Sequence, residues 1–287
     1  MSKIIQIKND CLTVSISTLG AELSSIKGNG GTEFLWEGDK AVWGGKAPVL
    51  FPICGAVKNN TYTFNGTEYN IPKHGFTKTS EFEGENLSHS KALFTLKSSA
   101  DTLSVYPFEF ILNITYELIK NELKITYCVE NPGKEEMYFS IGAHESYSCP
   151  EGIEEYCMEF EEPLTLDAYP VVGTCISNKT VRIGENIKTL PLKYEYFEVD
   201  ALIFKDVDFS KASLVHTKSS KKSSVVFDGF NNFLIWTKPD AKFICLEPWC
   251  GVLEIDGTTS DLVNKENIIK LPANNRFTLT HSITYEE

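Results

Sequence analysis

The strongest constraint on the fold is an alternation of apolar and polar residues with a period of two. Two such runs in Phe108–Glu130 flank a turn at Lys120 and Asn121, and residues 277–285 repeat the pattern with Thr and Ser on one face. Because successive side chains of a strand point to opposite faces, this is the period of strands buried on one side. The sequence therefore predicts a hairpin at Phe108–Glu130 and a strand near residue 280.

The remaining chain consists of short apolar segments between turns rich in Gly, Asn, Pro and Lys, without a sustained helical period. Short helical turns are expected near Tyr106–Phe108 and Asp261–Asn264. This rhythm is typical of an all-β antiparallel sandwich or barrel. With 287 residues and 42% hydrophobic content, we expect a single domain over residues 1–287. Further strands are expected at Lys3–Ser17, Ala92–Leu96, Met137–Ile141, Ser224–Phe227, Asn232–Trp236 and Phe243–Leu246.

The charge balance limits the possible partners. The chain has 27 basic and 39 acidic residues, a net charge of −12, and its only arginines are Arg182 and Arg276. Nucleic acids and anionic membranes both reward a basic face, so we expect neither as a partner. Arginine is the preferred group for bidentate phosphate recognition, so its scarcity also argues against a site that binds phosphate through arginine. Nothing in the sequence indicates an oligomeric state.

The cysteines indicate a reducing compartment. None of the eight has Cys-x-x-Cys spacing or stands near a histidine at metal-ligand spacing, so no metal is expected. The first residues lack the apolar core of a signal peptide, and no apolar run approaches the ~20 residues of a membrane helix. We therefore expect a cytoplasmic protein with reduced thiols.

Two of the five histidines lie where functional side chains are often found. His74 stands between Pro72 and Gly75 at a constrained turn. His144 follows a strand that ends near Gly142, and a rigid sheet often presents functional residues on such loops. For each, a hydrogen-bonded loop histidine is the alternative. The other three are not assigned a role. His281 is in phase with apolar strand residues, which indicates a structural histidine. His89 and His216 lie in polar turns exposed to solvent.

Two acidic residues are candidates. Glu247 follows the apolar strand Phe243–Leu246, where partial burial would raise its pKa toward that of a useful base. Trp249 beside it offers an apolar surface for the C–H face of a sugar ring. Asp200 stands at the entry to an apolar strand. The alternative for Glu247 is a glutamate that caps a strand end, and the alternative for Asp200 is a turn aspartate.

Motifs of serine hydrolases, P-loop nucleotide sites and zinc peptidases are absent from the sequence.

Taken together, several segments resemble the aldose 1-epimerase family of galactose mutarotase-like proteins. The resemblance covers almost the whole chain, and its strength lies in the order and spacing of the motifs. The matching segments are Ser17–Leu23, Ala47–Gly55, Tyr69–Phe76, Phe139–His144, Asp200–Leu202 and Leu246–Trp249.

The resemblance implies a large antiparallel β-sandwich, the galactose mutarotase-like supersandwich. It also implies acid–base catalysis without a cofactor on a small-molecule sugar. Glu247 would take the proton of the C1 hydroxyl, and His144 would protonate the ring oxygen. His74 would hydrogen-bond the ring oxygen or a neighbouring hydroxyl, and Asp200 would orient a hydroxyl. Trp249 would form a wall of the pocket.

The chain departs from the family pattern near these motifs. Ala56, Val57 and Lys58 follow Gly55, where well-studied galactose mutarotases carry an arginine. Lys58 is a candidate to replace that charge. Many relatives also have Ala-Arg after His-Gly-Phe, where this chain has Thr77 and Lys78. Lys58 and Lys78 are therefore candidate substrate-binding residues, and the identity of the sugar stays open.

Several functions remain in competition. The first is an aldose 1-epimerase of a free hexose such as galactose or glucose, and the second is a hexose-6-phosphate 1-epimerase. A non-catalytic carbohydrate-binding or regulatory protein of the same fold is the third, and a glycosidase, which also uses two carboxylates, is the fourth.

Trp36 and Trp43 either line the pocket or close the end of the sandwich, and we favour the latter.

Overall fold

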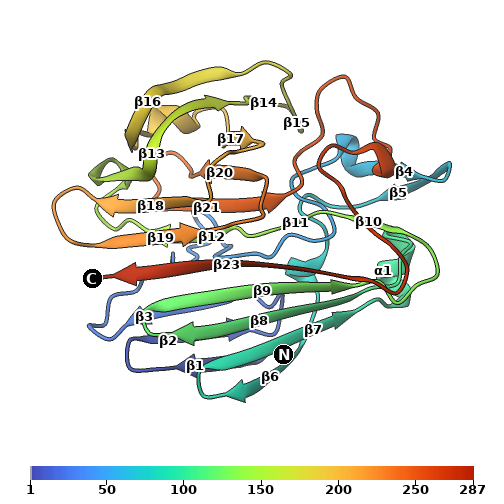
Figure 1. Cartoon of the computed structure of the whole chain (residues 1–287), viewed down its shortest axis with the longest axis horizontal. Coiled ribbons are helices and arrows are strands. Elements are labelled where there is room, and N and C mark those ends of the chain that lie inside the picture. The colour runs from blue at the N-terminus through green and yellow to red at the C-terminus, as the bar shows by residue number, and fades with distance from the viewer. Residues whose placement is uncertain (1) are drawn as a thin grey trace.

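The computed structural model describes residues 2–287, and their regular structure is nearly all strand (Figure 1). Within these residues the largest sheet is antiparallel and has nine strands in the order β16-β13-β18-β19-β23-β9-β8-β7-β6. In chain order these strands are β6 (Glu83–Ser88), β7 (Lys91–Lys97), β8 (Ile111–Ile119), β9 (Glu122–Glu130), β13 (Tyr156–Ala168), β16 (Val181–Pro191), β18 (Lys211–His216), β19 (Lys222–Val226) and β23 (Arg276–Glu286).

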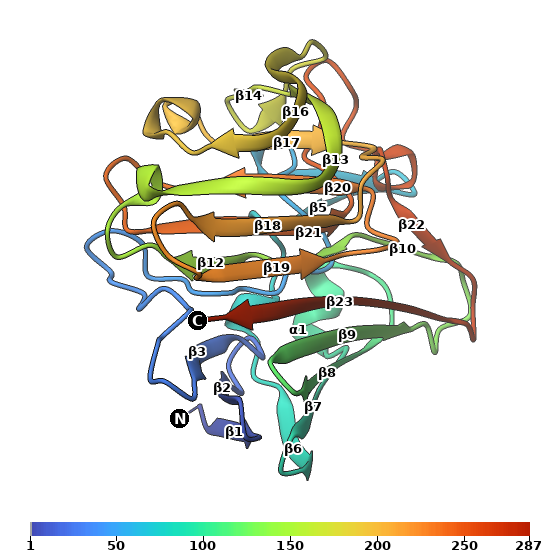
Figure 2. The same cartoon turned by 60° about the vertical axis from the view of Figure 1, so that its left-hand side comes forward.

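A second sheet has five strands, in which β21 pairs with β20, β11 and β12, and β20 pairs with β17. It packs on the large sheet through contacts such as Phe233 against Phe227, whose rings stack at 4.7 Å. In Figure 2, β20 and β21 run alongside β18 and β19. The two sheets form an antiparallel β-sandwich, as the sequence predicts. The strands are β11 (Ile141–Gly142), β12 (Glu145–Ser148), β17 (Leu202–Lys205), β20 (Asn232–Trp236) and β21 (Phe243–Cys250).

Smaller elements surround the sandwich. A three-stranded sheet contains β1 (Ile4–Lys8), β2 (Leu12–Ser17) and β3 (Leu23–Gly28). Two-stranded pairs are β4 (Thr61–Phe64) with β5 (Thr67–Asn70), β10 (Met137–Phe139) with β22 (Ile269–Leu271), and β14 (Val171–Val172) with β15 (Cys175–Ile176). The helical pieces are α1 (Ala100–Val105) and the 3-10 turns η1 (Lys58–Asn60), η2 (Thr77–Thr79), η3 (Ile153–Glu155), η4 (Tyr194–Phe197) and η5 (Leu262–Asn264).

The period-two alternation is confirmed in β8, β9 and β23. The strands β8 and β9 pair antiparallel around Lys120 and Asn121, and their apolar residues are buried in alternation. Lys120 has a φ of +56°, a left-handed conformation that suits the tight turn. The predicted hairpin is therefore present at the predicted place.

Two expectations near turns are corrected. The segment Lys3–Ser17 is two strands, because the Asn9 Oδ1 accepts hydrogen bonds from the backbone of Cys11 and Leu12 and turns the chain there. The helical turn expected at Tyr106–Phe108 lies earlier, as α1, with a capping box at Ser99. Because Tyr106 precedes Pro107, the helical conformation is disfavoured for it, and it is extended.

The strand β21 separates the core from the site because its side chains alternate between two faces. Ile244, Leu246 and Cys250 belong to the main core between the sheets. Glu247 and Trp249 project from the opposite face. A functional cavity can therefore form on the outer face of this sheet while the inner face stabilises the sandwich.

A buried polar pair lies between the two sheets. The Nε2 of His281 on β23 is 3.2 Å from Oε1 of Glu145 on β12, and both side chains are buried. The sequence predicts a buried structural histidine at position 281, which the structure confirms. Its partner is a residue that the sequence does not single out.

No helix in residues 2–287 is long and apolar enough to cross a lipid bilayer.

Candidate active site

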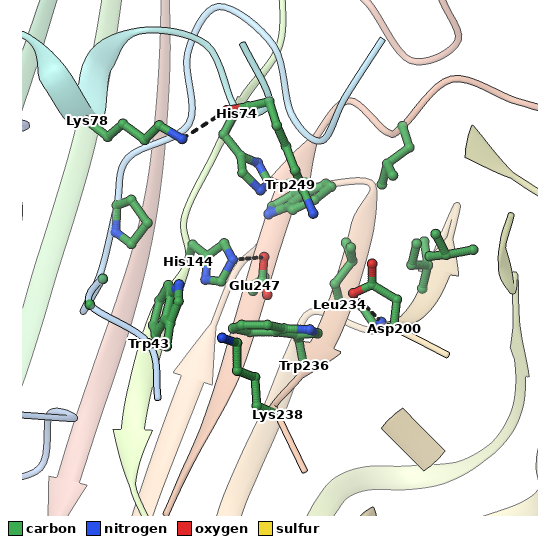
Figure 3. Close-up of a pocket in the computed structure, with 18 of the residues that line it drawn as sticks. Trp43, His74, Lys78, His144, Asp200, Leu234, Trp236, Lys238, Glu247 and Trp249 are labelled. Carbon is green, nitrogen blue, oxygen red and sulfur yellow. Dashed lines mark hydrogen bonds and ion pairs between the residues drawn. The ribbon is translucent and has the colours of Figure 1, made fainter. Parts of the chain in front are cut away.

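The strand β21 supplies the two central groups of the candidate site. Glu247 is 2% exposed and stands opposite Leu234 of β20, while Trp236 of β20 stands opposite Cys245. Since residues two apart share a face, Glu247 and Trp249 border the same cavity (Figure 3). The Nε1 of Trp249 donates a hydrogen bond of 3.1 Å to the carbonyl oxygen of Ala143, which fixes the indole.

His144 is held over Glu247 by strand pairing. It lies between β11 and β12, which both pair with β21, so that this segment runs alongside Glu247. A Cβ at Gly142 would lie 2.6 Å from the ring of Trp249, so the glycine permits this close approach. The Nε2 of His144 lies 3.4 Å from Oε2 of Glu247.

Burial opposes charge on both members of this pair. It raises the pKa of Glu247 well above the ordinary carboxyl range; nearby Lys73 opposes the shift and Asp200 adds to it. Burial lowers the pKa of His144 to about 3, and Lys73 contributes in the same direction. In the free protein, burial therefore favours the uncharged arrangement of the pair, with the proton on Glu247 and His144 neutral.

His74 reaches the same cavity from a strained loop. Its φ is +69°, and its backbone N–H donates to the carbonyl of Gly55 at 2.7 Å. The N–H of Gly55 in turn donates to Nδ1 of His74 at 3.1 Å, which leaves the imidazole proton on Nε2. Desolvation by burial lowers the pKa of His74, and the charge of a protonated His144 would lower it further. His74 is therefore a neutral hydrogen-bond donor through Nε2.

Three tryptophans shape the cavity. Trp43 stacks on His144 with ring centroids 5.2 Å apart, and Trp236 meets the same ring edge-on at 5.7 Å. Trp249 contacts His74 in the same edge-on manner at 5.6 Å. Trp36 instead is buried and donates from Nε1 to the carbonyl of Trp43. Our preference for placing both Trp36 and Trp43 at the end of the sandwich is therefore wrong for Trp43.

The cavity has a volume of about 560 Å³ and brings together most of the predicted site. His74, His144, Glu247, Asp200, Trp249 and Lys78 all line it. Lys58 does not: it is exposed in η1, and its backbone N–H binds Oε2 of Glu254 at 2.6 Å. The candidate replacement for the family's arginine therefore lies outside the cavity. Sequence reasoning did not assign Trp43, Trp236, Lys73 or Lys238, which line it as well.

We predict that Gly75→Ala disrupts the His74 loop. Gly75 has a φ of +74°, and an added Cβ would lie 2.1 Å from the carbonyl oxygen of Phe51. The combined strain and clash should lower the free energy of unfolding by more than about 3 kcal/mol and reduce turnover. The matched control is Gly66→Ala, where φ is +76° but no atom lies within 4 Å. It should cost only about 1 kcal/mol, and urea unfolding that shows equal losses would contradict the role of Gly75.

Comparisons with known proteins identify the family and the fold. The sequence profile of the aldose 1-epimerase family matches residues 3–265. Protein LacX, encoded on a plasmid of Lactococcus lactis subsp. lactis, is 35% identical over 262 residues, which cover 86% of this chain and 88% of LacX. A galactose mutarotase related enzyme from Lactobacillus acidophilus superposes with a TM-score of 0.95 at 30% identity, over 99% of this chain and 98% of that one. A galactose mutarotase-like protein from Lactobacillus casei has a TM-score of 0.90 at 26% identity, over 99% of this chain and 100% of that one.

Proposed function

The chain belongs to the aldose 1-epimerase family, and we propose that it interconverts the α and β anomers of a hexose by opening and reclosing the ring. The observation that carries this proposal is the 3.4 Å contact between Nε2 of His144 and Oε2 of Glu247 at a cavity wall. The hydroxyl oxygen O1 and the ring oxygen O5 are both bonded to C1. Two proton-transfer groups this close together can therefore serve both oxygens.

Ring opening is then a coupled pair of proton transfers. Glu247 takes the proton of the C1 hydroxyl as the C1=O bond forms and the C1–O5 bond breaks. His144 gives its proton to O5. After rotation about C1–C2, His144 takes the O5 proton back, O5 attacks the other face of C1, and Glu247 returns a proton to O1. Acid and base groups of this kind each contribute roughly 10²–10⁴-fold to the rate.

The number of protons on the pair stays constant through this cycle. The form with ionised Glu247 and protonated His144 opens the ring, and the form with protonated Glu247 and neutral His144 closes it. Both forms hold one proton. Burial favours that proton on Glu247 in the free protein, and in this proposal it passes to His144 when the sugar binds and the C1 hydroxyl takes its place beside the carboxylate.

The other cavity residues position the sugar. His74 donates from Nε2 to the ring oxygen or a neighbouring hydroxyl, and Asp200, whose Oδ1 accepts from the N–H of Ala201, orients a second hydroxyl. Trp249 faces the C–H side of the ring. We propose that this work needs no cofactor and takes place in the cytoplasm, in line with the eight cysteines, all of which are free.

A specific observation favours a phosphorylated hexose as a second candidate substrate. Lys73, Lys78 and Lys238 border the cavity, and none is within 4.0 Å of a carboxylate among the described residues. Lys78 and Lys238 donate to backbone carbonyls, those of Lys73 and Val42. In a chain with a net charge of −12, three ammonium groups without a carboxylate partner around one cavity suit an anionic substituent.

The proposed function is tested by polarimetry and NMR of freshly dissolved α-glucose and α-galactose and of the corresponding 6-phosphates. Acceleration of anomerisation in any of them supports the epimerase. A folded protein that binds these sugars without accelerating anomerisation would support the binding-protein alternative. Hydrolysis of a glycoside without anomerisation of the free sugar would point to a glycosidase.

We predict that Lys78→Met separates the two substrate classes. If Lys78 contacts a phosphate, its loss removes a charge-assisted hydrogen bond worth about 1.5–3 kcal/mol, so KM for a hexose 6-phosphate should rise about 10–100-fold. KM for the neutral hexose should change less than about threefold. Lys58→Met, which lies outside the cavity, is the control and should leave both values unchanged. Equal effects of Lys78→Met on neutral and phosphorylated sugars would contradict the anion-binding role.

A further inference from the structure

Three donor side chains of different chemistry meet beside the cavity. One ligand atom each from His144, Cys245 and Glu247 lies within 4.8 Å of the others, and all three residues are buried. Cys245 and Glu247 are two residues apart on β21 and share a face, while His144 descends from the loop between β11 and β12. Glu247 and His144 border the cavity, and Cys245 lies behind them.

The spacing of two of the three donors fits a tetrahedral divalent ion. With Zn–N and Zn–O bonds of about 2.0–2.2 Å, two ligand atoms on one zinc lie about 3.3–3.6 Å apart. The His144 Nε2–Glu247 Oε2 distance of 3.4 Å falls within this range. Three protein ligands would leave the fourth position directed toward the cavity, the arrangement of zinc sites that remain open to a further ligand.

An unpaired group supports the same conclusion. Nδ1 of His144 is buried and has no hydrogen-bond partner among the described residues, although buried ring nitrogens are normally satisfied. Because Nδ1 makes no hydrogen bond, the ring could adjust the direction of Nε2, the ligating nitrogen, toward an ion without breaking one. Trp43 stacks on the ring and would keep it over the site.

The donor set also selects the type of metal. Thiolate and imidazole ligands favour Zn²⁺ and Cd²⁺, whereas Mg²⁺ prefers oxygen atoms alone. Binding would displace the thiol proton of Cys245 and the carboxyl proton of Glu247 to solvent, which leaves two anionic ligands and a neutral imidazole. The charge of the ion would then be balanced within the site.

We propose that His144, Cys245 and Glu247 bind a thiophilic divalent cation such as Zn²⁺ or Cd²⁺, which inhibits the protein by occupying both proton-transfer groups. The inhibition rests on the proposed function, whereas the binding does not. The ion is an inhibitor in this proposal, since the acid–base cycle uses the same atoms without it.

The test is a titration of the whole protein with CdCl₂, followed by the ultraviolet charge-transfer absorbance of a cadmium–thiolate bond, and a parallel calorimetric titration with ZnCl₂. We expect one site per chain that MgCl₂ does not fill. In Cys245→Ser the thiolate signal at this site should vanish and affinity should fall at least 10–100-fold, the loss typical even for a group that only supports a ligand. Cys149→Ser, a buried cysteine outside the cluster, is the matched control and should bind as the unmodified chain does.

Activity gives the second measurement. Cys245 takes no part in the proposed proton transfers, so Cys245→Ser should anomerise sugars normally but require at least tenfold more Zn²⁺ for half-inhibition. Should serine impair folding, Cys245→Ala serves instead. Identical cadmium titrations of Cys245→Ser and the unmodified chain would overturn the metal site. A chain without epimerase activity that still shows the Cys245-dependent absorbance would overturn the proposed function and leave the metal site standing.

Discussion

Replacement of Glu247 by glutamine should lower kcat/KM for anomerisation by about 10²–10⁴-fold. Glutamine has nearly the shape of a protonated glutamate and keeps the hydrogen-bonding capacity of the site, but it cannot accept the C1 hydroxyl proton. Burial raises the pKa of Glu247 and so favours its neutral form, and the exchange for glutamine adds no buried charge. The melting temperature should therefore remain close to that of the unmodified chain while the rate falls, as polarimetry and calorimetry would show.

A matched control distinguishes the loss of the catalytic base from the loss of any buried carboxylate. Glu254 is also buried, but its oxygens bind the backbone of Lys58 and the hydroxyl of Ser260, and it does not line the cavity. Glu254→Gln should change stability more than Glu247→Gln and should reduce kcat/KM far less. Full activity in Glu247→Gln would rule out this carboxylate as the base.

Much of this site follows from local sequence patterns. The alternation in β8, β9 and β23 predicts their buried faces, and an apolar strand that ends in Glu247 predicts a partly desolvated acid. The loop positions of His74 and His144 mark them as candidates, and the resemblance to the aldose 1-epimerase family joins them with Glu247 in one site. The cavity brings these residues together in the structure.

The residues that sequence reasoning did not assign depend on long-range register. Trp236 reaches the cavity because it stands opposite Cys245 in the β20–β21 pair, and no local pattern fixes that register. Trp43 stacks on His144 from a loop a hundred residues away in sequence. The prediction of Lys58 at the site is wrong. Its position near Gly55 in the sequence suggests a substrate contact, but in the structure it lies in η1, outside the cavity.

Two adjacent residues where β12 begins, His144 and Glu145, point to opposite faces of the same sheet. His144 faces the cavity, while Glu145 faces the core and contacts His281 of the other sheet. The period-two rule predicts that neighbours point to opposite sides, but it does not say which side is the site. That assignment requires both sheets, which is why the sequence alone does not single out Glu145.

The last prediction concerns the pH dependence of His144→Gln. In the unmodified chain the active form of the Glu247–His144 pair holds one proton. As pH falls below about 3, the pKa of His144, the pair gains a second proton and loses its base. As pH rises through the elevated pKa of Glu247, the pair loses its only proton and kcat/KM declines. Because kcat/KM reports the free enzyme, a plateau should lie between these two limits.

In His144→Gln the active form changes, because glutamine carries no transferable proton and only the base remains. The rate should fall by about 10²–10⁴-fold. What is left requires ionised Glu247, so kcat/KM should now rise with pH through the same elevated pKa at which the unmodified chain declines. The opposite slopes, measured by polarimetry after subtraction of the uncatalysed rate, distinguish loss of the acid from general damage to the site. His89→Gln, in an exposed turn, should keep the original profile. Parallel profiles for His144→Gln and the unmodified chain would show that His144 is not the proton donor and that the shared-proton cycle is wrong.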